Sequence, residues 1–230
     1  LKENTIKRYL KFGVHFDNLY KSAALINVTQ KKLFFKNDVA SIDFGLGDNF
    51  RYNFNYYIDN GYLWSVGIQS KLNTFKRNID KPITSDFEYF VNLPKSLNLE
   101  FLDLTNRLYF QTFYKERFLI AVGFEHKFNQ VDIRNLSLTT PWLDKSHYFS
   151  GYANVMYDTY DNKYFPRKGL TFFAEYKNYF HSTDYTNSFN NFSQVNAEIG
   201  TVKTFFNKLS FEVKADIGVT LGNESSSFFR

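Results

Sequence analysis

Charged side chains at every second position are the residues of this sequence that could do chemistry. Carboxylates and lysines share these alternating positions, and the residues concerned are Glu125, Lys127, Glu175, Lys177, Glu198, Glu212, Lys214 and Asp216. A pair of carboxylates can act as general acid and general base. Here lysines lie close to most of the carboxylates in the same segments, which favours charge pairing over proton transfer. We therefore expect a hydrated charge network and no catalytic residue among them.

Motifs of the common enzyme and metal sites are absent from the sequence. It contains no Gly-x-Ser-x-Gly elbow, no Cys/His metal spacing, no phosphate-binding glycine loop and no cysteine. The four histidines, His15, His126, His147 and His181, are scattered, which is typical of ordinary wall, interface or loop residues. The net charge of +5 comes without a dense Lys/Arg cluster, so we expect no nucleic-acid partner. No metal or other cofactor is expected.

The stretch KLSFEVKADIGVTL, residues 208–221, indicates which element positions the charges. Side chains alternate across a β-strand, so this stretch has one polar face and one wholly apolar face. Strands of soluble proteins are mostly about 5–6 residues long, whereas a strand that spans a bilayer needs about 9–11 residues. We therefore predict a transmembrane strand whose lipid-facing residues include Leu209, Phe211, Val213 and Ile217.

The same alternation recurs along most of the 230 residues and predicts about eleven strands. Their centres lie at residues 10–16, 24–28, 40–46, 50–58, 64–72, 98–113, 118–124, 151–157, 170–176, 195–199 and 208–221. Aromatic residues make up 20% of the chain, yet the mean hydropathy is −0.40, because apolar and polar residues are interleaved. Asn106 interrupts the apolar face of its segment, which predicts a bulge or a slip there.

The connections between the predicted strands are mostly long at one end of the sheet and short at the other. Long polar connections are expected at residues 76–95, 129–147 and 181–191, and short ones at 59–61, 115–116 and 207; the connections near 17–19 and 48–49 are also short. Strands of soluble β-sandwiches and soluble β-barrels also alternate apolar and polar residues, with the apolar face turned toward the protein core. Strand length, loop asymmetry and charge depletion of the apolar face, where Lys203 is the clearest exception, favour a membrane protein. We predict one all-β domain over residues 1–230, an antiparallel up-and-down transmembrane β-barrel.

The most specific motif is YDTYDNKYFPRKG at residues 157–169, a turn with paired aspartates, a proline and a terminal glycine. It resembles the turn of the Omp85 (BamA-like) outer-membrane superfamily, which reads Asp-x-Arg-Asp and then Phe-Pro-x-x-Gly. The matching residues are Asp158, Asp161, Phe165, Pro166 and Gly169. Tyr160 stands where many members have arginine, which puts a fixed ion pair at this turn in doubt.

This resemblance implies a location in the bacterial outer membrane, with outer-membrane lipids as partners. A complete barrel of the family would have about sixteen strands, and even numbers are the rule for bacterial barrels. About eleven strands would therefore form a truncated barrel, ending before the family's lumenal Arg-Gly loop and closing strands. A homodimer is left open.

Residues 10–49 are similar to the first barrel strands of membrane-anchored patatin-like phospholipases. In those proteins a patatin hydrolase and a short POTRA linker precede the barrel, so the Ser–Asp dyad would lie upstream of Leu1. The resemblance implies a barrel that anchors, and helps to export, an N-terminal lipid acyl hydrolase absent from this chain. The alternatives are a BamA- or TamA-like insertase and a passive porin, which upstream sequence would distinguish.

Overall fold

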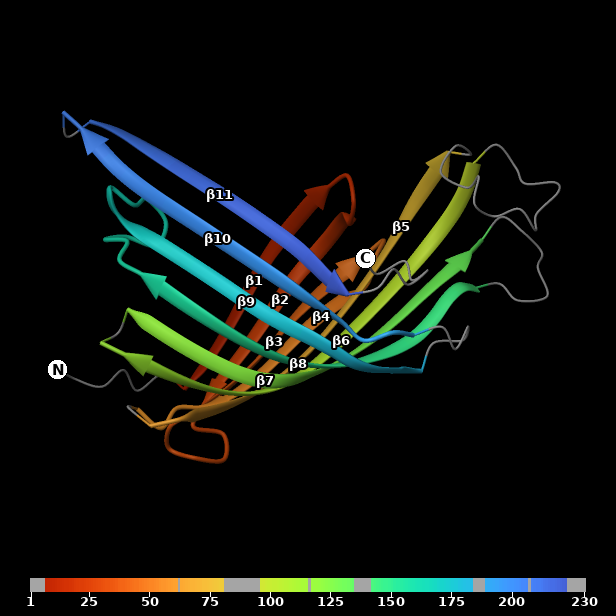
Figure 1. The fold of residues 1–230 in the computed structure, drawn as a ribbon, viewed down its shortest axis with the longest axis horizontal. Coiled ribbons are helices and arrows are strands. Elements are labelled where there is room, and N and C mark those ends of the chain that lie inside the picture. The colour runs from red at the N-terminus through yellow and green to blue at the C-terminus, as the bar shows by residue number, and fades with distance from the viewer. Residues whose placement is uncertain are drawn as a thin grey trace.

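The computed structural model describes residues 7–61, 63–80, 96–115, 117–134, 142–183, 189–206 and 208–222. They form eleven strands in one antiparallel sheet, each strand paired with its neighbours in chain order (Figure 1). The strands are β1 (Arg8–Asp17), β2 (Lys21–Lys31), β3 (Asp38–Gly47), β4 (Arg51–Ile58), β5 (Ser65–Asp80), β6 (Ser96–Tyr114), β7 (Phe118–Ile133), β8 (Trp142–Asp158), β9 (Lys168–Thr183), β10 (Phe192–Phe205) and β11 (Leu209–Gly222). The predicted all-β, up-and-down architecture is confirmed.

Register keeps each kind of side chain on one face of the sheet. Residues opposite each other in an antiparallel pair point to the same side. On β3, Phe44 lies opposite Ile26 and Tyr52, whereas Asp43 lies opposite Asn27 and Asn53. The local alternation of the sequence therefore becomes a continuous apolar face and a continuous polar face.

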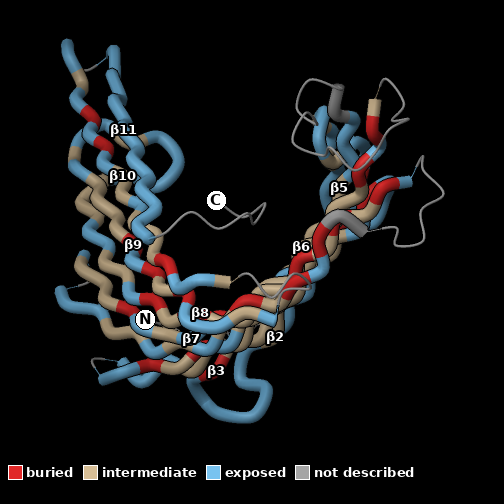
Figure 2. The backbone as a smooth tube through the Cα atoms, turned by 45° about the vertical axis from the view of Figure 1, so that its right-hand side comes forward, coloured by how far each residue is buried: buried red, intermediate tan, exposed pale blue. Residues whose placement is uncertain are grey.

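The sheet curves into an open trough with β1 and β11 at its edges (Figures 1 and 2). Because the trough is a single layer, its buried apolar clusters are small. Among the residues that the structure describes, one cluster comprises Leu97, Leu99, Val131 and Ile133, and a second comprises Tyr148, Tyr179 and Phe192. None of the described residues belongs to a helix long and apolar enough to cross a membrane.

The strands extend further into the expected long connections than predicted. β7 continues to Ile133 and β8 begins at Trp142, so much of the segment 129–147 is strand and not loop. Similarly, β5 reaches Asp80 and β9 reaches Thr183. A segment with polar residues on both faces resembles a loop when only the sequence is considered. Here cross-strand hydrogen bonds continue the strands beyond the residues that alternate between apolar and polar. Residues 81–95, 135–141, 184–188 and the predicted turns at 116 and 207 lie outside the described residues.

The predicted irregularity at Asn106 is wrong. β6 is paired without interruption through this position, with Asn106 opposite Ser70 on β5 and His126 on β7. The side chain is accommodated because it hydrogen-bonds both neighbours, at 2.7 Å and 3.3 Å. Register shifts occur instead at Val131/Asp132 and at Phe149/Ser150.

A buried carboxylate closes the turn between β2 and β3. Asp38 is only 1% exposed and accepts hydrogen bonds from the backbone amides of Leu33, Phe34 and Phe35 at 2.7, 2.8 and 2.9 Å. The Tyr56 hydroxyl donates to it as well, at 2.8 Å. One side chain thus satisfies several amides that the turn leaves without backbone partners.

Candidate functional site: the charged concave face

The polar face of the sheet is its concave face. Arg107 on β6 comes within 3.9 Å of Glu175 on β9, although strands three places apart are separated by roughly 14 Å in a flat sheet. Side chains converge in this way on the inside of a curve. The exposed fractions agree, since Glu125 on this face is 3% exposed whereas its neighbour Phe124 on the convex face is 64% exposed.

A four-residue ion-pair cluster occupies the middle of this face. The Arg107 Nε lies 2.5 Å from Glu125 Oε2, and the Lys177 Nζ lies 3.0 Å from Glu125 Oε1. Lys177 also lies 3.6 Å from Glu175 Oε1. Two cations thus face two carboxylates, so the cluster is neutral as a whole. We call Arg107, Glu125, Glu175 and Lys177 the central cluster.

Aromatic rings and a second ion pair surround the central cluster. The Arg107 guanidinium lies 5.0 Å from the centre of the Tyr152 ring, and Lys177 lies 5.9 Å from that of Tyr179. Beside them Lys127 Nζ lies 3.3 Å from Asp103 Oδ2. The cation–π contacts and ion pairs compensate the burial of these charges.

Sequence reasoning missed two members of this group, Arg107 and Asp103, both on β6. Arg107 lies directly opposite Glu125 in the β6–β7 register, and Asp103 lies two positions from Thr105, the residue opposite Lys127. The signal was present, because both residues are on the polar face of their segment. Finding the pairs required the register between strands, which the sequence does not show.

The other predicted network residues do not join the central cluster. On β11, Lys214 Nζ lies 3.0 Å from Glu212 Oε1, with both side chains largely exposed. Glu198 on β10 lies opposite Asp216 on β11, which sets two like charges side by side. Among the described residues no ion pair joins these side chains to the central cluster. Within the described part of the chain, the ion pairs therefore do not join all of the predicted network residues, and a single network stays a prediction.

The turn between β8 and β9 is built by its aspartates. Asp158 Oδ1 accepts the Tyr160 amide at 2.8 Å, and Asp161 Oδ1 accepts the amides of Arg167 and Lys168 at 2.8 and 3.3 Å. These backbone donors, that of Arg167 above all, lower the pKa of Asp161 below its ordinary value.

Proline and glycine complete the same turn. Pro166 follows the exposed Phe165 and comes before the strand β9 begins. Gly169 has φ +124°, and a Cβ there would collide with the carbonyl oxygen of Thr159. Glycine is therefore required at this position.

Tyr160 leaves the turn and reaches across the concave face. Its hydroxyl donates to Glu212 Oε1 on β11 at 3.3 Å. On the way the hydroxyl lies over Gly200, 2.8 Å from where a Cβ of that residue would be. Tyr160 therefore connects the turn to β11 by a tyrosine–carboxylate hydrogen bond.

The four residues predicted to face lipid lie on the opposite, convex face of β11. Leu209, Phe211, Val213 and Ile217 are 54%, 55%, 64% and 64% exposed. Phe211 lies opposite Lys203, the charged exception on this face, whose Nζ lies 5.4 Å from the Phe205 ring centre.

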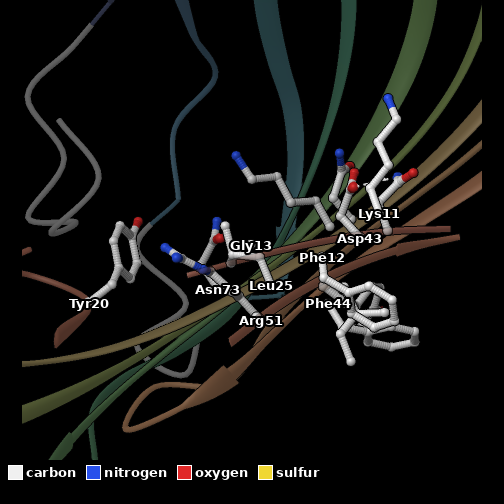
Figure 3. Close-up of a pocket in the computed structure, with 15 residues that line it drawn as sticks. Lys11, Phe12, Gly13, Tyr20, Leu25, Asp43, Phe44, Arg51 and Asn73 are labelled. Carbon is white, nitrogen blue, oxygen red and sulfur yellow. Dashed lines mark hydrogen bonds between the residues drawn. The ribbon is translucent and has the colours of Figure 1, made fainter. Parts of the chain in front are cut away.

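A second region of the concave face, on β1 to β5, forms a cavity of about 540 Å³ (Figure 3). Lys11 and Asp43 point into it, whereas Phe12 and Phe44 point to the other side of the strands. Its cations are Lys11, Arg51 and Lys71, none of which has an ion-pair partner among the described residues. Arg51 instead lies 4.5 Å from the Tyr20 ring centre. We call these three the open cation group.

Metal ligands are not clustered in the described part of the chain, where no group of three or more candidate side chains occurs. The carboxylates of the central cluster already have cationic partners. The arrangement can stabilise a hydrated wall and attract anions at the open cation group.

Comparison with known proteins gives one family. The sequence profile of the OMP85 superfamily matches the chain over residues 1–230, which includes all eleven strands and the turn at 157–169. No curated protein matches the chain. The match therefore identifies a superfamily without supplying an activity.

Proposed function

The chain belongs to the OMP85 superfamily, and on this premise we propose that it anchors an N-terminal patatin-like phospholipase and helps to export it. Members of this superfamily are bacterial outer-membrane proteins, so the protein is an outer-membrane β-barrel protein. The anchoring role is supported by the resemblance of residues 10–49 to the first barrel strands of such phospholipases.

The observation that carries the proposal is the charge pairing of the central concave face. Glu125, Glu175 and Asp103 each have a cationic partner, at distances of 2.5, 3.6 and 3.3 Å respectively. A carboxylate paired with a cation has its charge compensated within the wall, which suits a structural role better than acid catalysis. The chemistry of the whole protein would then lie in the hydrolase that precedes this chain.

The test is release of fatty acid from dioleoyl phosphatidylglycerol vesicles by the full-length protein purified in detergent. We expect hydrolysis that remains when Glu125 is replaced by glutamine, provided the barrel is assembled. The protein should also need detergent for solubility and migrate faster unheated than boiled on a denaturing gel. Absence of any hydrolase activity from the assembled protein would contradict the anchoring role.

The main alternative is a BamA- or TamA-like insertase, which the superfamily match supports equally well. Such a protein assembles client barrels into a bilayer, so the full-length protein in vesicles should accelerate the folding of an added outer-membrane barrel. Client assembly without lipid hydrolysis would replace the anchoring proposal with this one.

A further inference from the structure

Five polar side chains on adjacent strands form a row across the apolar convex face. They are Tyr52 on β4, Ser70 on β5, Asn106 on β6, His126 on β7 and His147 on β8. Each lies two residues from an apolar neighbour on the same face, such as Leu108 for Asn106 and Phe124 for His126. We call this set the convex polar chain. Polar groups that face lipid are costly, which makes a row of them a candidate functional feature.

The convex polar chain is continuous across its strands. The Tyr52 hydroxyl lies 3.1 Å from the Ser70 Oγ, and the Ser70 Oγ donates to Asn106 Oδ1 at 2.7 Å. Asn106 Nδ2 lies 3.3 Å from His126 Nδ1. His126 Nε2 lies 3.0 Å from His147 Nδ1.

Donor and acceptor roles make the chain run in one direction. Ser70 gives its only proton to Asn106, so Tyr52 must donate to Ser70. Asn106 Nδ2 can only donate, so His126 Nδ1 accepts and the neutral His126 carries its proton on Nε2. That proton goes to His147 Nδ1, which leaves Nε2–H of His147 as the last donor.

The last donor has no hydrogen-bond partner among the described residues. His147 lies near the start of β8, which is the end of the sheet with the long connections. In bacterial barrels this end faces outward. Lys145, two residues nearer that end on the same convex face, is exposed, and so is His181 on β9.

An apolar groove lies beside the convex polar chain. Its volume is about 370 Å³, and the convex side chains around it include Ile68, Leu108, Phe124, Phe149 and Phe180. Asn106 and His126 are the polar residues of the convex face that line it, and the concave-face residues Arg107, Glu125 and Ser150 also belong to its lining. The groove thus offers an apolar bed next to the hydrogen-bonding groups of the convex polar chain.

We propose that this groove binds a phosphate-bearing diacyl lipid of the outer leaflet. One acyl chain lies against Leu108, Phe124 and Phe180, and a phosphate oxygen accepts the hydrogen bond from His147 Nε2–H. An anionic oxygen suits this position because an ionised acceptor makes a stronger hydrogen bond with an N–H group than a neutral acceptor does. The inference does not depend on whether the barrel carries a hydrolase.

Native mass spectrometry of the detergent-purified protein tests the proposal, with the ether-linked dioleyl analogues of phosphatidylglycerol and of diacylglycerol as probes. An acyl hydrolase does not cleave ether-linked chains, and the two lipids have the same chains, so their difference reports the headgroup. His147→Phe removes the donor and keeps an aromatic ring, and Leu108→Trp fills the groove. Ile199→Trp, on the convex face of β10 and outside the groove, is the control. Faster migration of unheated samples verifies that each variant is assembled.

We expect the wild type to retain the phosphatidylglycerol analogue at least about tenfold better than the diacylglycerol analogue, because hydrogen bonds to charged acceptors are among the stronger ones. His147→Phe should abolish this preference, Leu108→Trp should reduce retention of both lipids, and Ile199→Trp should change neither. An unchanged preference in the assembled His147→Phe protein would overturn the proposal. So would a lipid-independent dimer that Leu108→Trp dissociates, because a second copy would then occupy the groove.

Discussion

Two regions of the concave face have the same alternation of polar and apolar residues but differ in how their charges are paired. We call the region on β6 to β9 the paired half and the region on β1 to β5 the open half. Across β6 to β9, Arg107 is paired with Glu125, Lys127 with Asp103, and Lys177 with Glu175. Across β1 to β5, the open cation group faces a cavity in which Asp43 is the only lining carboxylate among the described residues. Alternation puts charges on this face in both halves, but only cross-strand register decides whether they neutralise one another. The difference separates a structural wall from a surface available to anions.

The largest effect should come from breaking the central cluster. Glu125→Gln leaves Arg107 and Lys177 with one carboxylate between them, and removing one partner of a buried ion pair typically costs about 3–5 kcal/mol. Urea unfolding of the protein in detergent measures the loss. Asp43→Asn, on the open half, is the matched control and should change stability little. Equal losses would erase the distinction between the two halves.

The next effect tests the separation of concave and convex faces on β11. Ile217→Arg should destabilise the assembled protein by about 2–4 kcal/mol, because the side chain would face the bilayer core. Thr220→Arg, on the polar face, should be tolerated. Assembly is measured as the fraction of protein that migrates faster before heating. Similar fractions for both variants would reverse the assignment of the faces.

A smaller loss should follow from Asp38→Ala, which tests how the open half is stabilised. This half has no buried ion pair among the described residues of β1 to β5, but its turn carboxylate holds the amides of Leu33, Phe34 and Phe35. The urea midpoint should fall by less than for Glu125→Gln. Asp59→Ala, at the neighbouring turn, is the control, and a larger effect of this control would contradict the prediction.

The smallest stability effect should come from the open cation group itself. Lys71→Gln removes a cation without an ion-pair partner among the described residues and should alter unfolding by less than about 0.5 kcal/mol. It should nevertheless lower the anion preference of current through the reconstituted protein, because lumenal charges tune selectivity. The reversal potential in a salt gradient measures this preference. Lys177→Gln should show the opposite pattern, with a large loss of stability.

Much of the fold was predictable because the pattern that determines it is local. Alternation with a period of two defines a strand and its two faces without knowledge of any partner. Short connections then make neighbouring strands antiparallel. The strand ends were predicted less well, since β7 and β8 continue where Asn129 and Ser146 made the sequence look like loop.

The contacts of the site were not predictable from the same pattern. Arg107 meets Glu175 three strands away, and Tyr160 reaches Glu212 on β11. The sequence by itself determined that the chain forms strands with one apolar and one charged face. Only the tertiary structure decided which charges meet, because register and curvature bring together side chains that are far apart along the chain. The one-directional convex polar chain has the same origin, since each of its members comes from a different strand.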